Sequence, residues 1–303
     1  MVRAALDAGV NFFDTADIYS TGQSEEILGS SLKVAGIKRE SLVIASKVRG
    51  AMSAEASQGT GDVNNVGLSR KHIIASCDAS LRRLGTNCID LYQIHGIDPL
   101  TQLEETLEAL DDLVRRGKVL YVGCSNLPAQ HVAKALGISR RHGWAAFVSR
   151  QAYYSLVARG LEHELLPLCR EKGLGVLPWS PLSGDYLSGK YRQGKRAVGR
   201  RNDFDFPPIS PQAAEALDPL EAVARERQVS MTRVALAWLR QQPGVTSVIV
   251  GARSVEQLAD NLATADVELS ADEMERLAAP TRPPKLYPQW MMELQGGRRR
   301  PQS

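Results

Sequence analysis

The sequence lacks any uninterrupted run of about 18 apolar residues, the length that a membrane-spanning helix requires. It also lacks an apolar stretch of the signal-peptide type after its single early arginine, Arg3. We therefore expect a cytoplasmic protein without a membrane partner.

A strong excess of one charge is missing as well. The formal net charge is +3, and the run Arg298-Arg299-Arg300 supplies that many positive charges, so the rest of the chain is nearly neutral. Proteins that bind nucleic acid usually carry a basic patch or stripe. The charge balance argues against nucleic acid as the main partner.

Metal and disulfide signatures are also absent. The four cysteines, Cys77, Cys88, Cys124 and Cys169, include no CxxC pair and no spacing typical of metal ligands. Such cysteines are typical of free thiols in a reducing cytosol. The sequence thus predicts no metal site.

What is present is an ordinary globular composition, with 43% hydrophobic and 23% charged residues among 303. This length fits one large α/β domain or two medium ones. No internal repeat or low-complexity linker divides the chain. We predict one domain over residues 1–280, followed by a tail over residues 281–303 that packs on it.

Short apolar runs alternate with longer segments of helical periodicity. Residues 73–84 and 103–114 have helix spacing and are followed by Gly85 and Gly117, which favour helix ends. Seven runs are expected to be strands: residues 10–13, 42–45, 89–94, 119–122, 146–148, 175–177 and 246–250. Repeated β-then-α order predicts an α/β fold with a parallel sheet, either a barrel or a doubly wound sheet.

Three of these runs end in polar residues. Asp14 follows the first run, Lys47 the second and His95 the third, and Tyr19 comes five residues after Asp14. Parallel barrels concentrate function at the C-terminal ends of their strands. A Lys beside a Tyr favours the phenolate, and an Asp beside that Lys keeps it charged. Such a Tyr can protonate a developing alkoxide while a nearby His hydrogen-bonds a carbonyl oxygen.

Each of these residues alone has a plainer interpretation. An Asp after a strand is often a helix cap. A Lys at that position is usually a solvated charge, and a single His is more often structural. Their occurrence at successive strand ends is what favours a common site.

A phosphate-loop motif is nearly present but incomplete. Residues 184–190 fit the spacing GxxxxGK, but Tyr191 stands where a Ser or Thr is required for Mg²⁺. We therefore reject a nucleotide-triphosphate site.

Four spaced segments together form a more specific pattern. They are residues 9–19 (GVNFFDTADIY), 46–48 (SKV), 90–95 (DLYQIH) and 123–126 (GCSN). On these segments the chain resembles the aldo-keto reductase family over nearly its whole length. The resemblance implies a (β/α)₈ TIM-type barrel that uses NADPH to reduce aldehydes and ketones.

The resemblance assigns roles to the polar residues at the strand ends. Asp14, Tyr19, Lys47 and His95 match the family's catalytic tetrad. Tyr19 would donate the proton, Lys47 with Asp14 would tune it, and His95 would orient the carbonyl group.

The resemblance also implies a cofactor site for NADP(H). Ser125, Asn126 and Gln151 match residues that hold the nicotinamide carboxamide, and Trp179 matches an aromatic residue at or near the nicotinamide face. A core tryptophan is the plainer interpretation of Trp179. The loop that crosses the pyrophosphate would begin with Ser180, Leu182 and Ser183, with Lys190 and Arg192 available nearby.

The adenosine end would follow the last predicted strand. The residues that match it are Gly251, Arg253, Gln257, Asp260 and Asn261. Arg253 at a helix N-terminus suits a phosphate dianion, which favours NADPH over NADH. Gln257 has a second interpretation, because Ser254 and Gln257 have the spacing of a capping box.

Two features depart from the family pattern. Family members have a first barrel strand before the helix in which this chain opens, so we expect an N-terminally incomplete barrel with seven readable strands. Asp185 would place an acid near the pyrophosphate, where it would weaken binding.

Two alternatives to a carbonyl reductase stay open. One is an NADPH-binding barrel with little turnover, channel-associated or redox-sensing, and the other is an inactive truncated chain. The expected partner is a small-molecule carbonyl substrate. Residues 48–69 and the tail near Trp290 carry substrate specificity in this family but show no chemical signature here. The sequence carries no signature of an oligomeric state.

Overall fold

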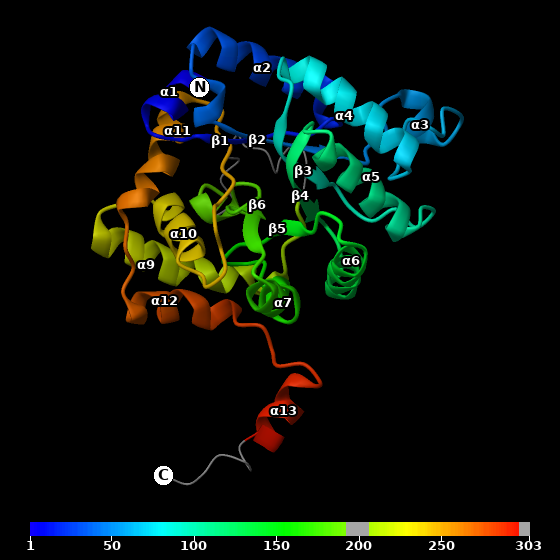
Figure 1. The fold of residues 1–303 in the computed structure, drawn as a ribbon. Helices are drawn as coiled ribbons and strands as arrows, with labels where there is room; N and C mark the ends of the chain where they lie inside the picture. Colours follow the sequence, from blue (N-terminus) through cyan, green and yellow to red (C-terminus); the bar gives the residue numbers. More distant parts are fainter. Residues whose placement is uncertain (192–205, 297–303) are drawn as a thin grey trace.

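The centre of the protein is a sheet of six parallel strands. It is seen in a computed structural model that describes residues 1–191 and 206–296 (Figure 1). Each strand pairs in parallel with the next strand along the chain. In order, the strands are β1 (Phe12–Asp14), β2 (Val43–Val48), β3 (Ile89–Ile94), β4 (Val119–Ser125), β5 (Phe147–Tyr153) and β6 (Gly175–Trp179).

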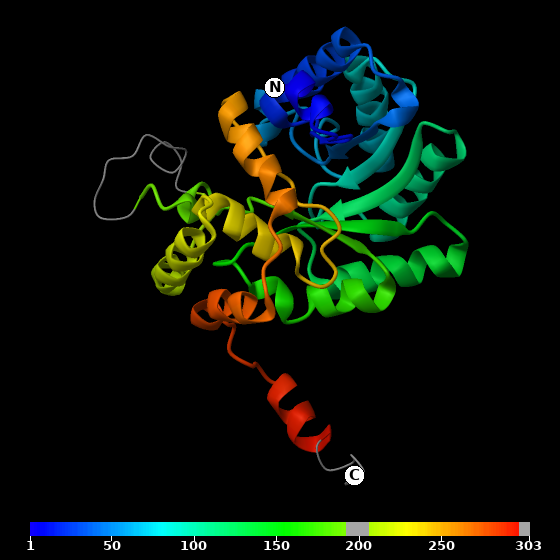
Figure 2. The same ribbon diagram turned by 90° about the vertical axis from the view of Figure 1, so that its left-hand side faces the viewer.

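The sheet is curled, because residues from its two end strands meet on its inner face. Ala45, Leu91 and Leu177 form a small buried cluster there, against which Phe12 of β1 and Ile249 also pack. Helices lie around the outside of the sheet (Figures 1 and 2). The result is an α/β fold with a half-barrel of parallel strands, which is consistent with the predicted (β/α)₈ type.

Helices connect the strands and complete the molecule. They are α1 (Val2–Asp7), α2 (Gln23–Ala35), α3 (Ala54–Gln58), α4 (Arg70–Leu84), α5 (Leu103–Arg115), α6 (Ala129–His142), α7 (Leu165–Lys172), α9 (Leu217–Arg227), α10 (Met231–Arg240), α11 (Val255–Leu262), α12 (Ala271–Ala278) and α13 (Gln289–Gly296).

The glycine signals for helix ends are confirmed. Gly85 follows α4 with φ +65°, and Gly117 lies two residues beyond α5 with φ +69°. Residues with a Cβ avoid this left-handed region, so glycine stops a helix there at little cost. The apolar face of α5 buries Leu107, Leu110 and Leu113 completely, each contributing roughly 2 kcal/mol.

The prediction of a seventh strand over residues 246–250 is wrong. That segment runs beside β6 but forms only an isolated bridge, between Val176 and Val245. The backbone N–H groups of Thr246 and Ile249 donate to the carbonyls of Val176 and Pro178. The two donors are therefore three residues apart on this segment, whereas their two acceptors are two residues apart on β6. Pro178 also has no N–H to donate to the segment, so no regular ladder of hydrogen bonds forms.

The C-terminal segment leaves the body of the molecule after α12. The Thr281 hydroxyl donates to the Leu156 carbonyl oxygen at 2.6 Å, and the Gln289 amide donates to the His163 carbonyl oxygen at 2.8 Å. Helix α13 extends outward from these anchors and buries none of its residues (Figures 1 and 2). Across the described ranges, no helix combines the length and apolarity needed to span a membrane.

Candidate active site

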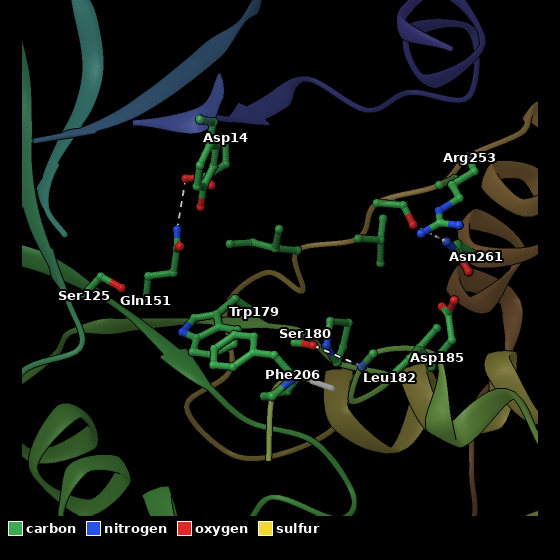
Figure 3. A pocket seen from close by; sticks show the side chains of 18 of the residues that line it. Asp14, Ser125, Gln151, Trp179, Ser180, Leu182, Asp185, Phe206, Arg253 and Asn261 are labelled. Atoms are coloured by element: carbon green, nitrogen blue, oxygen red, sulfur yellow. Dashed lines mark hydrogen bonds between the residues drawn. The ribbon is translucent and has the colours of Figure 1, made fainter. Parts of the chain in front are cut away.

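A cavity of about 750 Å³ opens at the C-terminal ends of the strands. Asp14 of β1, Ser125 of β4, Gln151 of β5 and Trp179 of β6 line it at one end (Figure 3). Tyr19 and His95 also line the cavity, so it is bordered by six of the predicted residues: Asp14, Tyr19, His95, Ser125, Gln151 and Trp179. The parallel sheet brings them together because all its strands point the same way.

Lys47 lies behind the cavity wall and is completely buried. Its Nζ donates to Asp14 Oδ2 at 2.5 Å and to the Thr15 carbonyl oxygen at 2.8 Å. The same Nζ lies 3.5 Å from the Tyr19 hydroxyl and 5.0 Å from the centre of the Tyr19 ring. A buried ammonium paired with one carboxylate therefore faces the phenol from inside the barrel, where charges interact more strongly than in water.

Two glutamine amides hold the other oxygen of Asp14. The Nε2 atoms of Gln93 and Gln151 donate to Asp14 Oδ1 at 3.1 and 2.9 Å. Sequence reasoning missed Gln93. The strand period of two offered a signal, because Gln93 lies two residues before His95 and so faces the same side of β3.

His95 lies beside Tyr19, with ring centroids 5.7 Å apart and an edge-on angle of 76°. Burial, together with the charges of Lys47 and Arg49, lowers the pKa of His95 from 6.5 to about 4. The imidazole is therefore neutral near pH 7 and can donate one N–H to a ligand oxygen. The Asn126 side chain donates to the His95 carbonyl oxygen at 3.1 Å, which ties the ends of β3 and β4 together.

The polar groups at this end suit a planar amide. The Ser125 hydroxyl is buried and has no hydrogen-bond partner among the described residues. A buried hydroxyl without a partner is costly, so its position on the cavity wall fits a ligand that supplies one. Asn126 and Gln151 add amide donors and acceptors to the same wall.

An aromatic stack forms one side of the cavity. Trp179 stacks on Tyr153 with centroids 4.9 Å apart and on Phe206 with centroids 5.9 Å apart. Trp179 and Phe206 both line the cavity. Trp179 is therefore a wall residue with aromatic contacts, which separates it from an ordinary core tryptophan.

The loop after β6 crosses the middle of the cavity. Ser180, Leu182 and Asp185 line it, whereas Ser183 is fully buried and its hydroxyl contacts those of Ser155 and Tyr153. Ser180, Ser183 and Asp185 have φ between +50° and +71°. Left-handed residues can form a concave anion site where neighbouring N–H groups converge, although the N–H groups of Ser183 and Gly184 donate to Ser180 here.

Asp185 does not carry an isolated negative charge. Lys190 Nζ lies 2.7 Å from Asp185 Oδ2, so the two charges offset each other at the cavity rim. The acid that departs from the family pattern thus has a compensating partner five residues later. Arg192 lies outside the described residues.

Arg253 and Asn261 lie at the opposite end of the cavity from Asp14 and Gln151 (Figure 3). Gly251 and Gln257 line this end too. The Gln257 amide oxygen accepts from the Arg253 backbone N–H at 2.9 Å, so Gln257 also braces the start of α11.

Asp260 faces away from the cavity. Its carboxylate accepts from the Ser230 hydroxyl and from Arg233 Nε, both at 2.7 Å. Adjacent helix positions point in different directions, so Asp260 and Asn261 cannot both face the cavity, and the sequence pattern alone does not say which of them does.

Two further acidic residues, Glu25 and Asp17, are completely buried near Lys47. Glu25 accepts from the Ser46 hydroxyl at 2.5 Å and from Arg83 Nε at 2.7 Å. Asp17 is completely buried, and neither carboxylate oxygen has a partner among the described residues. Burial, then the charge of Glu25, raises the pKa of Asp17 from 3.8 to about 7.

In the part of the chain that the structure describes, no group of His, Cys, Asp and Glu has the arrangement of a metal site. All four cysteines are unpaired.

Comparison with known proteins places this cavity in context. The model of the aldo/keto reductase family matches residues 1–280. The versiconal hemiacetal acetate reductase of Aspergillus parasiticus is 35% identical over 95% of this chain and 88% of that protein. An aldo-keto reductase of Fusarium vanettenii is 35% identical, over 92% of this chain and 81% of its own length. An oxidoreductase of Bacillus subtilis is 37% identical, over 88% and 82%.

Proposed function

The chain belongs to the aldo/keto reductase family and is an oxidoreductase, and on this premise we propose that it uses NADPH to reduce small aldehydes or ketones. The observation that carries the proposal is the buried Lys47 ammonium, which contacts Asp14 and faces the Tyr19 hydroxyl at the cavity floor. This arrangement is suited to proton transfer at a carbonyl oxygen.

The residues along the cavity fit a dinucleotide. Ser125, Asn126 and Gln151 would hold the carboxamide, with Trp179 against the ring. The backbone of the loop at residues 180–185 would face the pyrophosphate, and Arg253 with Asn261 would face the adenosine. When bound, NADPH supplies the hydride for the carbonyl carbon.

The residues of the chain supply the proton and the orientation. Tyr19 donates its hydroxyl proton to the carbonyl oxygen as negative charge develops there. The Lys47 ammonium stabilises the phenolate that remains, and Asp14 keeps that ammonium charged and in place. The neutral His95 donates an N–H to the same oxygen and fixes its direction.

Arg253 favours NADPH over NADH in this proposal. Its side chain is exposed at the start of α11 and lines the cavity. A guanidinium pairs with a phosphate through two parallel hydrogen bonds, and NADH lacks the 2′-phosphate that would receive them.

Tyr19→Phe tests the assignment, because it removes only the hydroxyl. Turnover should fall by at least about 100-fold, as expected for loss of a general acid, while the Kd for NADPH stays unchanged. Tyr121→Phe is the matched control, since Tyr121 is exposed on β4, away from the cavity. Retained turnover in Tyr19→Phe would remove Tyr19 from the mechanism.

The same experiment separates the alternative of an NADPH-binding protein with little turnover. That protein would bind NADPH without reducing any member of a carbonyl panel, with or without the Tyr19 hydroxyl. The buried Lys47–Asp14 pair supports turnover, because a binding protein has no need of a charged group behind a phenol. A cytoplasmic location and a lack of nucleic-acid and membrane partners stay predictions.

A further inference from the structure

Asp14 Oδ1 has two donors that differ in their surroundings. Gln151 lines the cavity, so its amide is within reach of a ligand. Gln93 is completely buried, does not line the cavity, and donates to the same oxygen from β3. A ligand can therefore compete for one donor but not for the other.

Resting on the proposed function, we propose that Gln93 is a positioning residue that keeps Asp14 on Lys47 when the cofactor takes the Gln151 amide. Asp14 has one oxygen on Lys47 Nζ and the other on the two amides. Holding both oxygens fixes the plane of the carboxylate. If Gln93 were absent, binding at Gln151 would leave Oδ1 without a donor, and the carboxylate would be free to turn away from Lys47.

The orientation of the Gln93 amide is fixed by chemistry. A carboxylate oxygen only accepts, so the amide nitrogen must face Asp14. The amide oxygen Oε1 is then left buried without a partner among the described residues. An unpaired buried oxygen is unfavourable, so this orientation lowers the stability of the fold while it places an N–H donor on Asp14.

The neighbouring strands make room for this side chain. Gln93 pairs in register with Lys47 on one side and with Gly123 on the other, so all three lie in one layer of the barrel. A Cβ at Gly123 would lie 3.1 Å from Gln93 Cγ and 2.6 Å from Ser149 Oγ. The absence of a side chain at Gly123 lets Gln93 reach across the barrel to Asp14.

Two substitutions at Gln93 test the role. Gln93→Leu removes the donor, and we expect kcat to fall by about tenfold while the Kd for NADPH changes by less than about twofold. Gln93→Glu keeps the shape, and its new carboxyl can donate to Asp14 only while protonated. Its kcat relative to wild type should therefore fall as pH rises, a dependence that a packing defect would not produce. Ser149→Ala, in the same layer, is the control and should keep wild-type kcat.

A measurement without cofactor tests the shared acceptor. Gln93→Leu and Gln151→Leu each leave one donor on Asp14 Oδ1, whereas the double variant leaves none. The loss in Tm of the double variant should exceed the sum of the single losses by about 2 °C. An additive loss overturns the inference, because it means that the two amides do not support one oxygen.

The outcomes separate this inference from the proposed function. Turnover in wild type together with unchanged kcat in Gln93→Leu overturns the role of Gln93 alone. A parallel loss of NADPH binding in Gln93→Leu also overturns it, because a positioning residue acts on turnover. Absence of turnover in wild type overturns the proposed function and, with it, this role.

Discussion

Replacing Asp17 by Asn should stabilise the protein strongly at about pH 8 and very little at about pH 4. Asp17 is completely buried without a hydrogen-bond partner in the described structure, and its pKa is raised from 3.8 to about 7. Each unit of difference between the pKa values of the folded and unfolded states corresponds to about 1.4 kcal/mol. At pH values above the folded pKa, the buried charge therefore lowers the free energy of unfolding by up to about 4 kcal/mol.

Proton binding determines whether the free energy of unfolding rises or falls with pH. The folded chain binds the Asp17 proton more tightly than the unfolded chain, so unfolding releases a proton between about pH 4 and pH 7. Stability from the neutral acid is present at low pH and is lost as pH rises toward the folded pKa. His95 acts in the opposite direction, because its pKa is lowered to about 4 and its contribution grows between about pH 4 and 6.5. Comparing variant with wild type cancels the His95 contribution, since both chains carry it.

The assay is urea unfolding followed by tryptophan fluorescence from about pH 4 to pH 8. The stability difference between Asp17→Asn and wild type should grow with pH and level off above about pH 7. Asp7→Asn, at an exposed position on α1, is the control for a surface carboxyl. A difference of constant size across this range would refute the buried-charge argument.

Four further predictions follow from the geometry. Lys47→Met should abolish turnover, because Asp14 loses its charged partner and Tyr19 its ammonium; steady-state kinetics check this. Arg253→Ala should raise the Kd for NADPH about tenfold more than the Kd for NADH, and equal increases in fluorescence titrations would remove its phosphate role. His95 should add no acid limb to kcat/KM between about pH 5 and 7, because its pKa is about 4; a limb lost in His95→Gln would contradict this. Gly123→Ala should cost about 1–3 kcal/mol in urea unfolding because its Cβ has no room, whereas Gly137→Ala on α6 has open space and should not.

Much of the fold was predictable from local pattern. Glycine-terminated helices such as α4 and α5 follow directly from apolar spacing and the left-handed preference of glycine. Strand ends were harder, because β2 continues through Ser46 and Lys47 to Val48. Polar residues predict the end of a strand only when they reach solvent, and these two are completely buried.

The convergence of the candidate site residues was predictable from their occurrence at successive strand ends. Asp14 ends β1, Lys47 is the second-to-last residue of β2 and His95 follows β3, so the parallel strands bring these three together, and Tyr19 lies on the short helix after β1. The strand period places Gln93 on the same side of β3 as His95, but its hydrogen bond to Asp14 was not predictable, since an amide within a strand gives no sign of the partner it will find. The direction in which a side chain points also escaped the sequence, as the Asp260 carboxylate on Arg233 shows.

The order of the strands in space bears on how the chain acquires its structure. Because β1 to β6 pair in the sequence in which they are synthesised, each new strand meets an edge that the preceding strand has already formed. Each strand pairing then closes a loop of little more than one connecting segment, so the conformational entropy lost at each step is small. A chain leaving the ribosome can extend its sheet one unit at a time, and polar groups from successive strands arrive at the same rim as each unit is added.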